Sequence, residues 1–233
     1  MTHPATIAVL RQAAAVLIDH PGERLYATLD VVAAALRDVA LDAPGPAADL
    51  LAVHDHLAAT PPLAAAGHHV DTFDLRRRTS LHLTWYTDGD TRRRGASLAA
   101  LKTALTGAGW RITGGELPDH LGVLLEFAAR GDAATGHRLL CELRPSIDVL
   151  HAALTEDGSV YARALAAVVA TLPAPSADTE SAWRRLARNG PPSEDVGLDG
   201  YGHGTPLGMP SVRADSRPGR GSRRRARMET VPR

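Results

Sequence analysis

The chain has 233 residues, in which 26 Lys and Arg side chains balance 26 Asp and Glu, and 4% of the residues are aromatic. This length allows a sizeable core without disulfides or metals. A single cysteine excludes an intrachain disulfide, which suits a reducing compartment. No apolar run approaches the roughly 18 residues of a membrane span. The start of the chain also lacks the basic stretch of an export signal, so we expect a cytoplasmic protein.

The balanced charge hides two regions of different composition. Residues 1–189 carry 18 basic and 21 acidic side chains, whereas residues 190–233 carry 8 arginines and 5 acidic residues. The second region also holds 8 Gly and 6 Pro. Such a segment buries too little apolar surface to offset its ordering entropy. We therefore expect a helical body over 1–189 and a disordered tail rich in Arg, Gly and Pro over 190–233.

Apolar residues in the body recur at steps of three and four, the period of an α-helix. Proline and glycine separate the stretches. The expected helices, in chain order, lie near 7–17, 25–39, 50–57, 69–87, 98–105, 118–128, 132–154 with a kink or break at Pro145, 161–172 and 183–186. No stretch alternates with the period of two that marks a strand. The pattern predicts an all-α protein, a single bundle of eight or nine helices.

The chain lacks the common catalytic signatures, including Gly-x-Ser-x-Gly, the phosphate-binding loop and His-Glu-x-x-His. Cys141 lies among leucines on a predicted helix, which favours a buried, inert thiol over a nucleophile. The densest histidine groups are His54-x-His56 and His68-His69, without a neighbouring carboxylate cluster. Residues two apart on a helix face different ways. We therefore expect no metal site and no bound cofactor.

Three arginine runs begin at Arg76, Arg92 and Arg223. In the first run, Asp74 precedes Arg77 and Arg78 by three and four residues, the spacing of ion pairs on a helix. The run in the tail could contact phosphates. The body is acidic, however, and no aromatic residue interleaves the tail arginines. We therefore expect solvated charges and no nucleic-acid partner.

Two segments, residues 70–95 (VDTFDLRRRTSLHLTWYTDGDTRRRG) and 116–128 (ELPDHLGVLLEFA), are more specific. In this order and spacing they resemble the NarJ-type assembly chaperones, the delta subunits of respiratory nitrate reductase. The strong match covers about 70–130. The resemblance implies an all-helical protein without catalysis that binds the apo form of the catalytic alpha subunit, in the alpha–beta complex. Such a chaperone keeps that subunit competent for molybdenum cofactor insertion and delays its docking on the membrane anchor.

The resemblance also implies which residues bind the client's N-terminal peptide. In the wider group a Pro-x-Asp-His segment takes part, and here the match is approximate because the intervening residue is missing. The residues carried over are Asp71, Phe73, Asp74, Arg77, Pro118, Asp119, His120 and Glu126.

Several of these residues have a plain structural alternative. Asp119 and His120 fall in the predicted first turn of a helix, where a carboxylate is favoured by the helix dipole and could serve as a cap. Asp71 could likewise be a favourable helix start. Phe73 and Leu81 fit the core better than a groove. Two other classes of function stay open, a generic helical adaptor for another client, and a helical enzyme or DNA-binding regulator.

Overall fold

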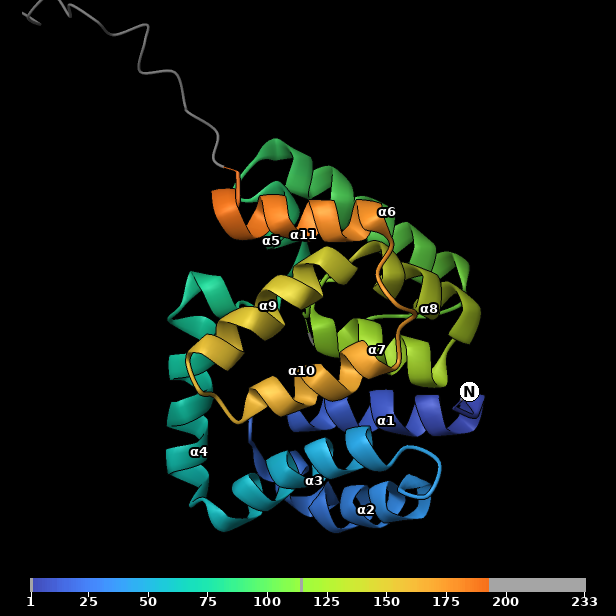
Figure 1. Cartoon of the computed structure of the whole chain (residues 1–233), viewed down its shortest axis with the longest axis vertical. Helices are drawn as coiled ribbons and strands as arrows, with labels where there is room; N and C mark the ends of the chain where they lie inside the picture. Colours follow the sequence, from blue (N-terminus) through green and yellow to red (C-terminus); the bar gives the residue numbers. More distant parts are fainter. Residues whose placement is uncertain (1, 114, 193–233) are drawn as a thin grey trace, which may run out of the picture. The chain divides into compact units, whose positions relative to one another are not determined.

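The computed structural model of the chain describes residues 2–113 and 115–192. Within these ranges the chain forms α-helices and no strand, which confirms the predicted all-α class (Figure 1). The eleven helices are α1 (Pro4–Leu17), α2 (Glu23–Val39), α3 (Pro44–Ala59), α4 (Pro62–His69), α5 (Leu83–Asp88), α6 (Arg92–Gly107), α7 (Leu121–Arg130), α8 (Ala133–Glu142), α9 (Arg144–Glu156), α10 (Tyr161–Ala170) and α11 (Ala177–Asn189). In this part of the chain no helix has the length and apolar character needed to cross a membrane.

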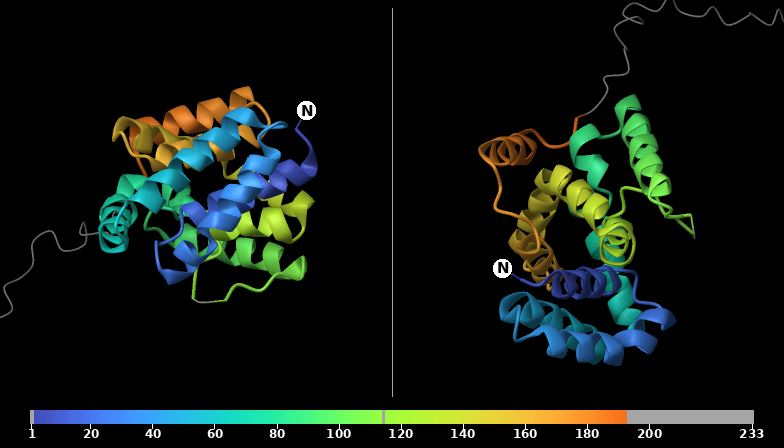
Figure 2. Two further views of the ribbon diagram at one scale, coloured as in Figure 1. Left: turned by 90° about the horizontal axis from the view of Figure 1, so that it is seen from below. Right: turned by 90° about the vertical axis from the view of Figure 1, so that its right-hand side faces the viewer.

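Helix α1 lies at the centre of the bundle. Its stripe of Leu10, Ala14 and Leu17 is buried. The helix packs against α2 and α3 on one side and against α7 and α10 on the other (Figures 1 and 2). Each fully buried leucine contributes about 1.5–3 kcal/mol of transfer free energy. The apolar stripes read from the sequence therefore supply the core of this bundle.

A buried arginine joins α1 to two later helices. Arg11 donates to the hydroxyl and the carbonyl oxygen of Thr171, both at 3.2 Å, and lies 2.9 Å from Nδ1 of His137. Burial lowers the pKa of Arg11 from its usual value, although the Cys141 side chain opposes this. These bonds satisfy a charge that would otherwise destabilise the core.

The helix predicted over 69–87 is wrong. After α4 the chain makes a π-helical turn over Val70–Asp74 and a 3-10 turn over Arg77–Thr79, and only then begins the short α5. The Thr79 hydroxyl donates to the carbonyl oxygen of Thr72 and closes a loop between them. Hydroxyl side chains that bond the main chain compete in this way with regular helix.

The other departures concern where helices begin and end. Pro145 stands in the first turn of α9, which confirms the expected break after α8. Helix α4 was not expected separately and, with that break, raises the helix count. Helix α11 confirms the element expected around Trp183. Of the predicted tail 190–233, all but residues 190–192 lies outside the described residues.

Candidate functional site

Two segments singled out from the sequence meet at the starts of α5 and α7. Two main-chain hydrogen bonds, of 3.0 and 2.9 Å, join residues 81–83 to residues 119–121. They form an isolated antiparallel bridge between His82 and His120. The bridge brings the two parts of the family-like sequence into one structural unit.

Asp119 lies at the centre of this unit with a side chain that is 0% exposed. Its carboxylate accepts hydrogen bonds from the hydroxyl and the main-chain N–H of Thr84, at 2.5 and 3.3 Å. It also lies 3.1 Å from Nδ1 of His82 and 3.7 Å from the Arg94 guanidinium. Burial alone would raise the pKa of Asp119, but the bonds from His82 and Thr84 and the nearby positive charges outweigh it and lower the pKa.

The placement of Asp119 and His120 in a helical first turn is wrong. Helix α7 begins at Leu121, and His120 is its N-cap residue without a side-chain capping bond. The Asp119 carboxylate turns away from α7 and accepts from Thr84 at the start of α5. Asp119 therefore fixes α5 and α6 against the segment before α7, and it bonds the first turn of α5 instead of capping α7.

Four histidines line a cavity of about 250 Å³ beside this junction, namely His20, His69, His82 and His120. The rings meet edge to face in two pairs, His20 with His69 and His82 with His120, each with centroids 5.4 Å apart. Phe73, Asp74 and Glu116 also line it, together with Ile18, Asp19, Ser80 and Leu81. Phe73, Asp74 and His120, three of the predicted site residues, thus lie around one cavity.

Two of these histidines favour the neutral imidazole. Burial is the main cause that lowers the pKa of His69 and of His120 below the usual value. The His69 ring lies with Nε2 3.1 Å from the carbonyl oxygen of Ile18. Among the residues that the structure describes, no three His, Cys, Asp or Glu side chains converge as metal ligands would.

A second cavity, of about 510 Å³, shares His20, Glu116 and His120 with the first. Helices α1, α2 and α7 and the segment around Trp110 line it. Glu126 stands on its wall and pairs with Arg130 at 2.7 Å. The predicted residue Glu126 is therefore close to the histidine cavity, on the other side of His120.

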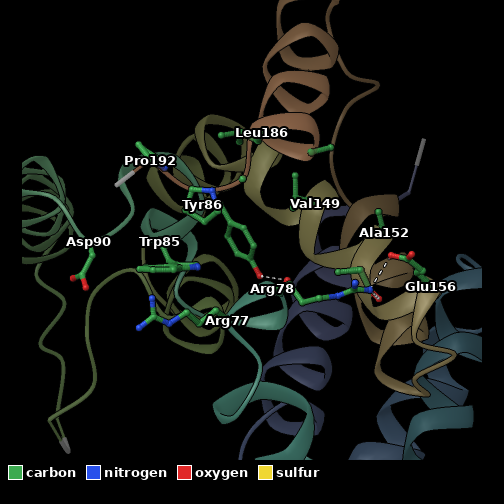
Figure 3. A pocket seen from close by; sticks show the side chains of 14 residues that line it. Arg77, Arg78, Trp85, Tyr86, Asp90, Val149, Ala152, Glu156, Leu186 and Pro192 are labelled. Carbon is green, nitrogen blue, oxygen red and sulfur yellow. Dashed lines mark hydrogen bonds and ion pairs between the residues drawn. The ribbon is translucent and has the colours of Figure 1, made fainter. Parts of the chain in front are cut away.

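A largely apolar hollow lies elsewhere, over α9 (Figure 3). We call it the α9 groove. It measures about 580 Å³ and is lined by Arg77, Arg78, Trp85, Tyr86, Asp90, Val149, Ala152, Ala153, Glu156, Leu186, Ala187 and residues 190–192. The Arg77 guanidinium lies 5.4 Å from the centre of the Trp85 ring, within the range of a cation–π contact. Apolar side chains thus form the floor, and charged groups stand at the rim.

Ion pairs hold one wall of the α9 groove in place. Arg78 pairs with Glu156 at 2.8 Å and with Asp157 at 2.9 Å, and Arg76 pairs with Asp157 at 3.1 Å. The expected pairs of Asp74 with Arg77 and Arg78 are absent from this described segment, because it is not a continuous helix. Arg76 and Arg78 instead pair with Glu156 and Asp157 at the end of α9.

The eight predicted residues thus fall into four groups. Phe73, Asp74, His120 and Glu126 lie around the two connected cavities, and Arg77 lies in the α9 groove. Pro118 and Asp119 are buried, and Asp71 is exposed on the π-helical turn. Phe73 and Leu81 are core residues, 4% and 5% exposed, as the alternative interpretation had it.

Sequence reasoning missed most of the lining of both hollows. His20 lay outside any motif, and His82 stood within the family-like segment but was not singled out. Val149 and Leu186 belonged to two separate predicted helices. What these residues share is that their neighbours in the hollows come from distant parts of the chain, which a local sequence pattern does not show. The aromatic pair Trp85-Tyr86 within the family-like segment was the one local signal.

Cys141 is half-buried, and its sulfur lies 3.7 Å from Nε2 of His137. Burial raises the pKa of the thiol, with Arg11 and Arg144 opposing. The thiol therefore stays protonated at neutral pH, which fits an inert side chain better than a nucleophile. It is more exposed than the sequence led us to expect.

Comparison with known proteins places this helical bundle in a family. The family model described as nitrate reductase delta subunit matches residues 27–167, and the chain belongs to this family. It is 42% identical to the nitrate reductase-like protein NarX of Mycobacterium tuberculosis over 164 residues, 70% of this chain and 24% of the relative. The chain therefore spans about a quarter of that protein's length.

Two further relatives are named as chaperones. The probable nitrate reductase molybdenum cofactor assembly chaperone NarJ of Bacillus subtilis is 32% identical over 111 residues, 48% of this chain and 60% of the relative. The nitrate reductase molybdenum cofactor assembly chaperone NarJ of Escherichia coli is 33% identical over 101 residues, 43% of each chain. The resemblance seen in the sequence is confirmed at the level of the family.

Proposed function

We propose that this protein is an assembly chaperone of respiratory nitrate reductase. It binds the apo alpha subunit in the alpha–beta complex, keeps that subunit competent for molybdenum cofactor insertion and delays membrane docking until the subunit is complete. The observation that carries the proposal is the family match over residues 27–167, with relatives that are named as NarJ chaperones. On this proposal the chain has no catalytic activity of its own and works in the cytoplasm.

The α9 groove supports the proposal as the place for the client's N-terminal peptide. Grooves that take amphipathic helices combine an apolar floor with charges at the rim. Here Trp85 and Val149 stand on the apolar floor, and Arg77 and Glu156 stand at the rim (Figure 3). The indole nitrogen of Trp85 is shielded from solvent and has no hydrogen-bond partner among the described residues. It is a donor that a bound peptide could satisfy.

The Pro118–His120 segment has an indirect role in this proposal. Asp119 is buried and bonds Thr84, the residue immediately before Trp85. Asp119 therefore positions Trp85 on the floor of the α9 groove and does not itself touch the client. The connected histidine cavities lie on the other side of the same junction, where His120 and Glu126 are available to a longer client segment.

Peptide binding tests this proposal. A peptide from the N-terminus of the alpha subunit should bind the full chain, and Trp85→Ala should weaken binding about tenfold or more, because a truncated aromatic anchor typically costs over 1.4 kcal/mol. Fluorescence anisotropy of a labelled peptide measures both affinities. Leu63→Ala, which removes an 88% exposed side chain of α4, serves as the control and should leave the affinity unchanged.

Two results would contradict the proposal. Failure of the peptide to bind the wild-type chain would refute the chaperone function as stated. Equal affinities of wild type and Trp85→Ala, with both proteins folded by circular dichroism, would move the peptide away from the α9 groove. A generic adaptor, the other candidate, would instead bind a different client, and co-purification with the nitrate reductase alpha subunit separates the two.

A further inference from the structure

Helix α11 differs from the other long helices in how little of its side-chain surface it buries. It is thirteen residues long, and none of its residues is fully buried. Its packing is chiefly against α9 (Figure 1). Leu186 packs against the core (Figure 3), and Trp183 lines a cavity together with residues of α9. Acidic residues occupy its first turn and Arg188 its last, so its polar face suits solvent. It is an amphipathic helix laid on the surface of α9.

Hollows flank α11 on both sides. The α9 groove, of about 580 Å³, lies along one side, and a second cavity of about 710 Å³ lies along the other. Ala152 and Glu156 of α9 line both of them, so α11 lies astride a single face of α9. The Trp183 indole nitrogen is shielded from solvent but has no hydrogen-bond partner in the described part of the chain. A helix that is fully packed into a core has neither cavities along its sides nor a shielded donor without a partner.

Exposed connections flank α11. Before it, residues 173–176 are exposed and include Pro173 and Pro175, and the carbonyl oxygen of Pro173 accepts a hydrogen bond from Arg144. After it, Gly190 has a left-handed φ of 67°. The carbonyl of Pro192 then approaches Gly89 so closely that a Cβ there would lie 1.7 Å from the oxygen. The residues that follow α11 thus contact the turn between α5 and α6.

We propose that α11 is a built-in occupant of a helix-binding surface on α9 and α5, and that a partner helix takes its place. The chemistry of α11 defines that partner as an amphipathic helix with an aromatic and a leucine side chain three residues apart, like Trp183 and Leu186. Identification of the partner with the client's N-terminal helix rests on the function proposed above.

The lining of the α9 groove favours replacement over addition, because α11 itself supplies part of that lining. Leu186 and Ala187 of α11 line the groove together with Val149 and Ala152 of α9. Ala152 and Glu156 line the hollows on both sides of α11, so withdrawal of α11 joins these hollows into one surface.

A tethered occupant makes the chaperone selective. A short connection holds α11 near its seat at an effective concentration of about the millimolar range. A client helix then binds with an apparent dissociation constant equal to the intrinsic one divided by the fraction of chains in which α11 is unseated. Weak amphipathic segments are excluded, and a well-matched client displaces α11.

The test uses the full-length chain and a labelled peptide with the sequence of residues 176–190 as the probe. In the variant Trp183→Ala/Leu186→Ala the chain's own α11 loses its apolar anchors, so the surface is free. This variant should bind the probe at least tenfold more tightly than wild type, as measured by anisotropy. The matched control Arg185→Ala/Arg188→Ala changes residues of α11 that line neither hollow, and it should bind like wild type. Equal affinities of wild type and the Trp183/Leu186 variant, or no binding to either, would overturn the proposal.

A second full-length variant tests the same proposal with Trp183 and Leu186 in place, in case the first variant does not fold. Ala152→Cys and Ala187→Cys, in a Cys141→Ser background, place thiols on α9 and α11 at the same groove. A bis-methanethiosulfonate linker should then form a disulfide with each thiol, hold α11 on α9 and abolish binding of the labelled peptide. A thiol reductant should cleave these disulfides and restore binding of the peptide. Undiminished binding by the locked chain would also overturn the proposal.

The two proposals can fail separately. The probe comes from this chain, so its binding tests the α11 surface whatever the client is. The alpha-subunit peptide tests the chaperone function. Binding of the client peptide that is unaffected by the lock would leave the chaperone standing and refute the role of α11.

Discussion

At the scale of single residues, Asp119 determines how the family-like segments fit together. A buried carboxylate is stable only if donors and positive charges replace the water that it loses. Thr84, His82 and Arg94 supply them, and they come from the two helices that precede the Pro118–His120 segment. A residue that the family resemblance placed at a binding surface therefore works inside the molecule.

Asp119→Ala should lower the free energy of unfolding by about 3 kcal/mol, because it leaves buried donors and a positive charge without their partner. Urea denaturation followed by circular dichroism measures the loss. Glu126→Ala is the comparison, since it removes a carboxylate paired with the exposed Arg130, and it should cost less than about 1 kcal/mol. Similar losses for the two variants would show that the Asp119 bonds contribute little.

The buried histidines should make stability depend on pH. The pKa values of His69 and His120 are lowered in the folded chain, chiefly by burial. As the pH falls below about 6.5, the unfolded chain therefore takes up protons before the folded chain does. Stability should be full above about pH 6.5 and decline toward pH 5. Urea denaturation at pH 7.5 and 5.5 measures the decline.

The double variant His69→Gln/His120→Gln should reduce this pH dependence, because glutamine does not titrate. Burial also lowers the pKa values of His68, His137 and His151, so part of the decline should remain. Glutamine at 69 can still donate to the carbonyl oxygen of Ile18, which His69 faces. A decline as steep as that of wild type would assign the effect to other groups.

At the scale of elements, close approach of two helices decides which glycines are needed. Gly136 of α8 lies against Ala128 of α7, and a Cβ at 136 would come within 2.5 Å of the Ala128 Cα. Gly67 of α4 has open space where its Cβ would be. Both are helical, so local preference alone treats them alike.

Gly136→Ala should therefore destabilise the protein by about 1–3 kcal/mol, since a crowded contact outweighs the better helix propensity of alanine. Gly67→Ala should stabilise it by up to about 1 kcal/mol, since only the propensity changes. Thermal denaturation of the two variants against wild type gives opposite shifts in Tm. Shifts of the same sign would contradict the assigned contact between α7 and α8.

At the scale of the whole molecule, the proposed chaperone shifts its client between two states. Insertion of a cofactor needs an open client, and an open client exposes apolar surface that aggregates. A chaperone that binds the open form raises its population by no more than its differential affinity for the two forms. Once the cofactor is in place, the closed form predominates and the chaperone leaves.

Loss of this protein from the cell should therefore leave alpha and beta subunits present but largely inactive, with molybdenum cofactor missing from the alpha subunit. Immunoblots, cofactor analysis and nitrate reductase assays of a deletion strain measure the three effects. Other molybdenum enzymes should keep their activity, which controls for cofactor supply. Fully active nitrate reductase in a strain without any related chaperone would contradict an assembly role.

The sequence by itself determined the helical class, the core-facing residues and the family. Stripes such as Leu10–Leu17 mark the buried face of a helix, because residues spaced three or four apart lie on one face and an apolar face is the one that packs inward. Proline and glycine marked most helix ends for the same reason, as at Pro145. The family followed from two continuous segments that need no knowledge of the fold.

Only the tertiary structure decided what happens between 69 and 88 and where the grooves lie. An apolar helical period runs through that segment, but the bond from Thr79 to Thr72 replaces helix there and the bond from Thr84 to Asp119 fixes α5. The Thr79–Thr72 bond lies in the part that is not helical, whereas Thr84 belongs to α5 and its partner Asp119 is 35 residues away. A local pattern records neither partner. The α9 groove likewise exists because α5, α9 and α11 converge, and long-range packing alone brings Trp85, Val149 and Leu186 to one surface.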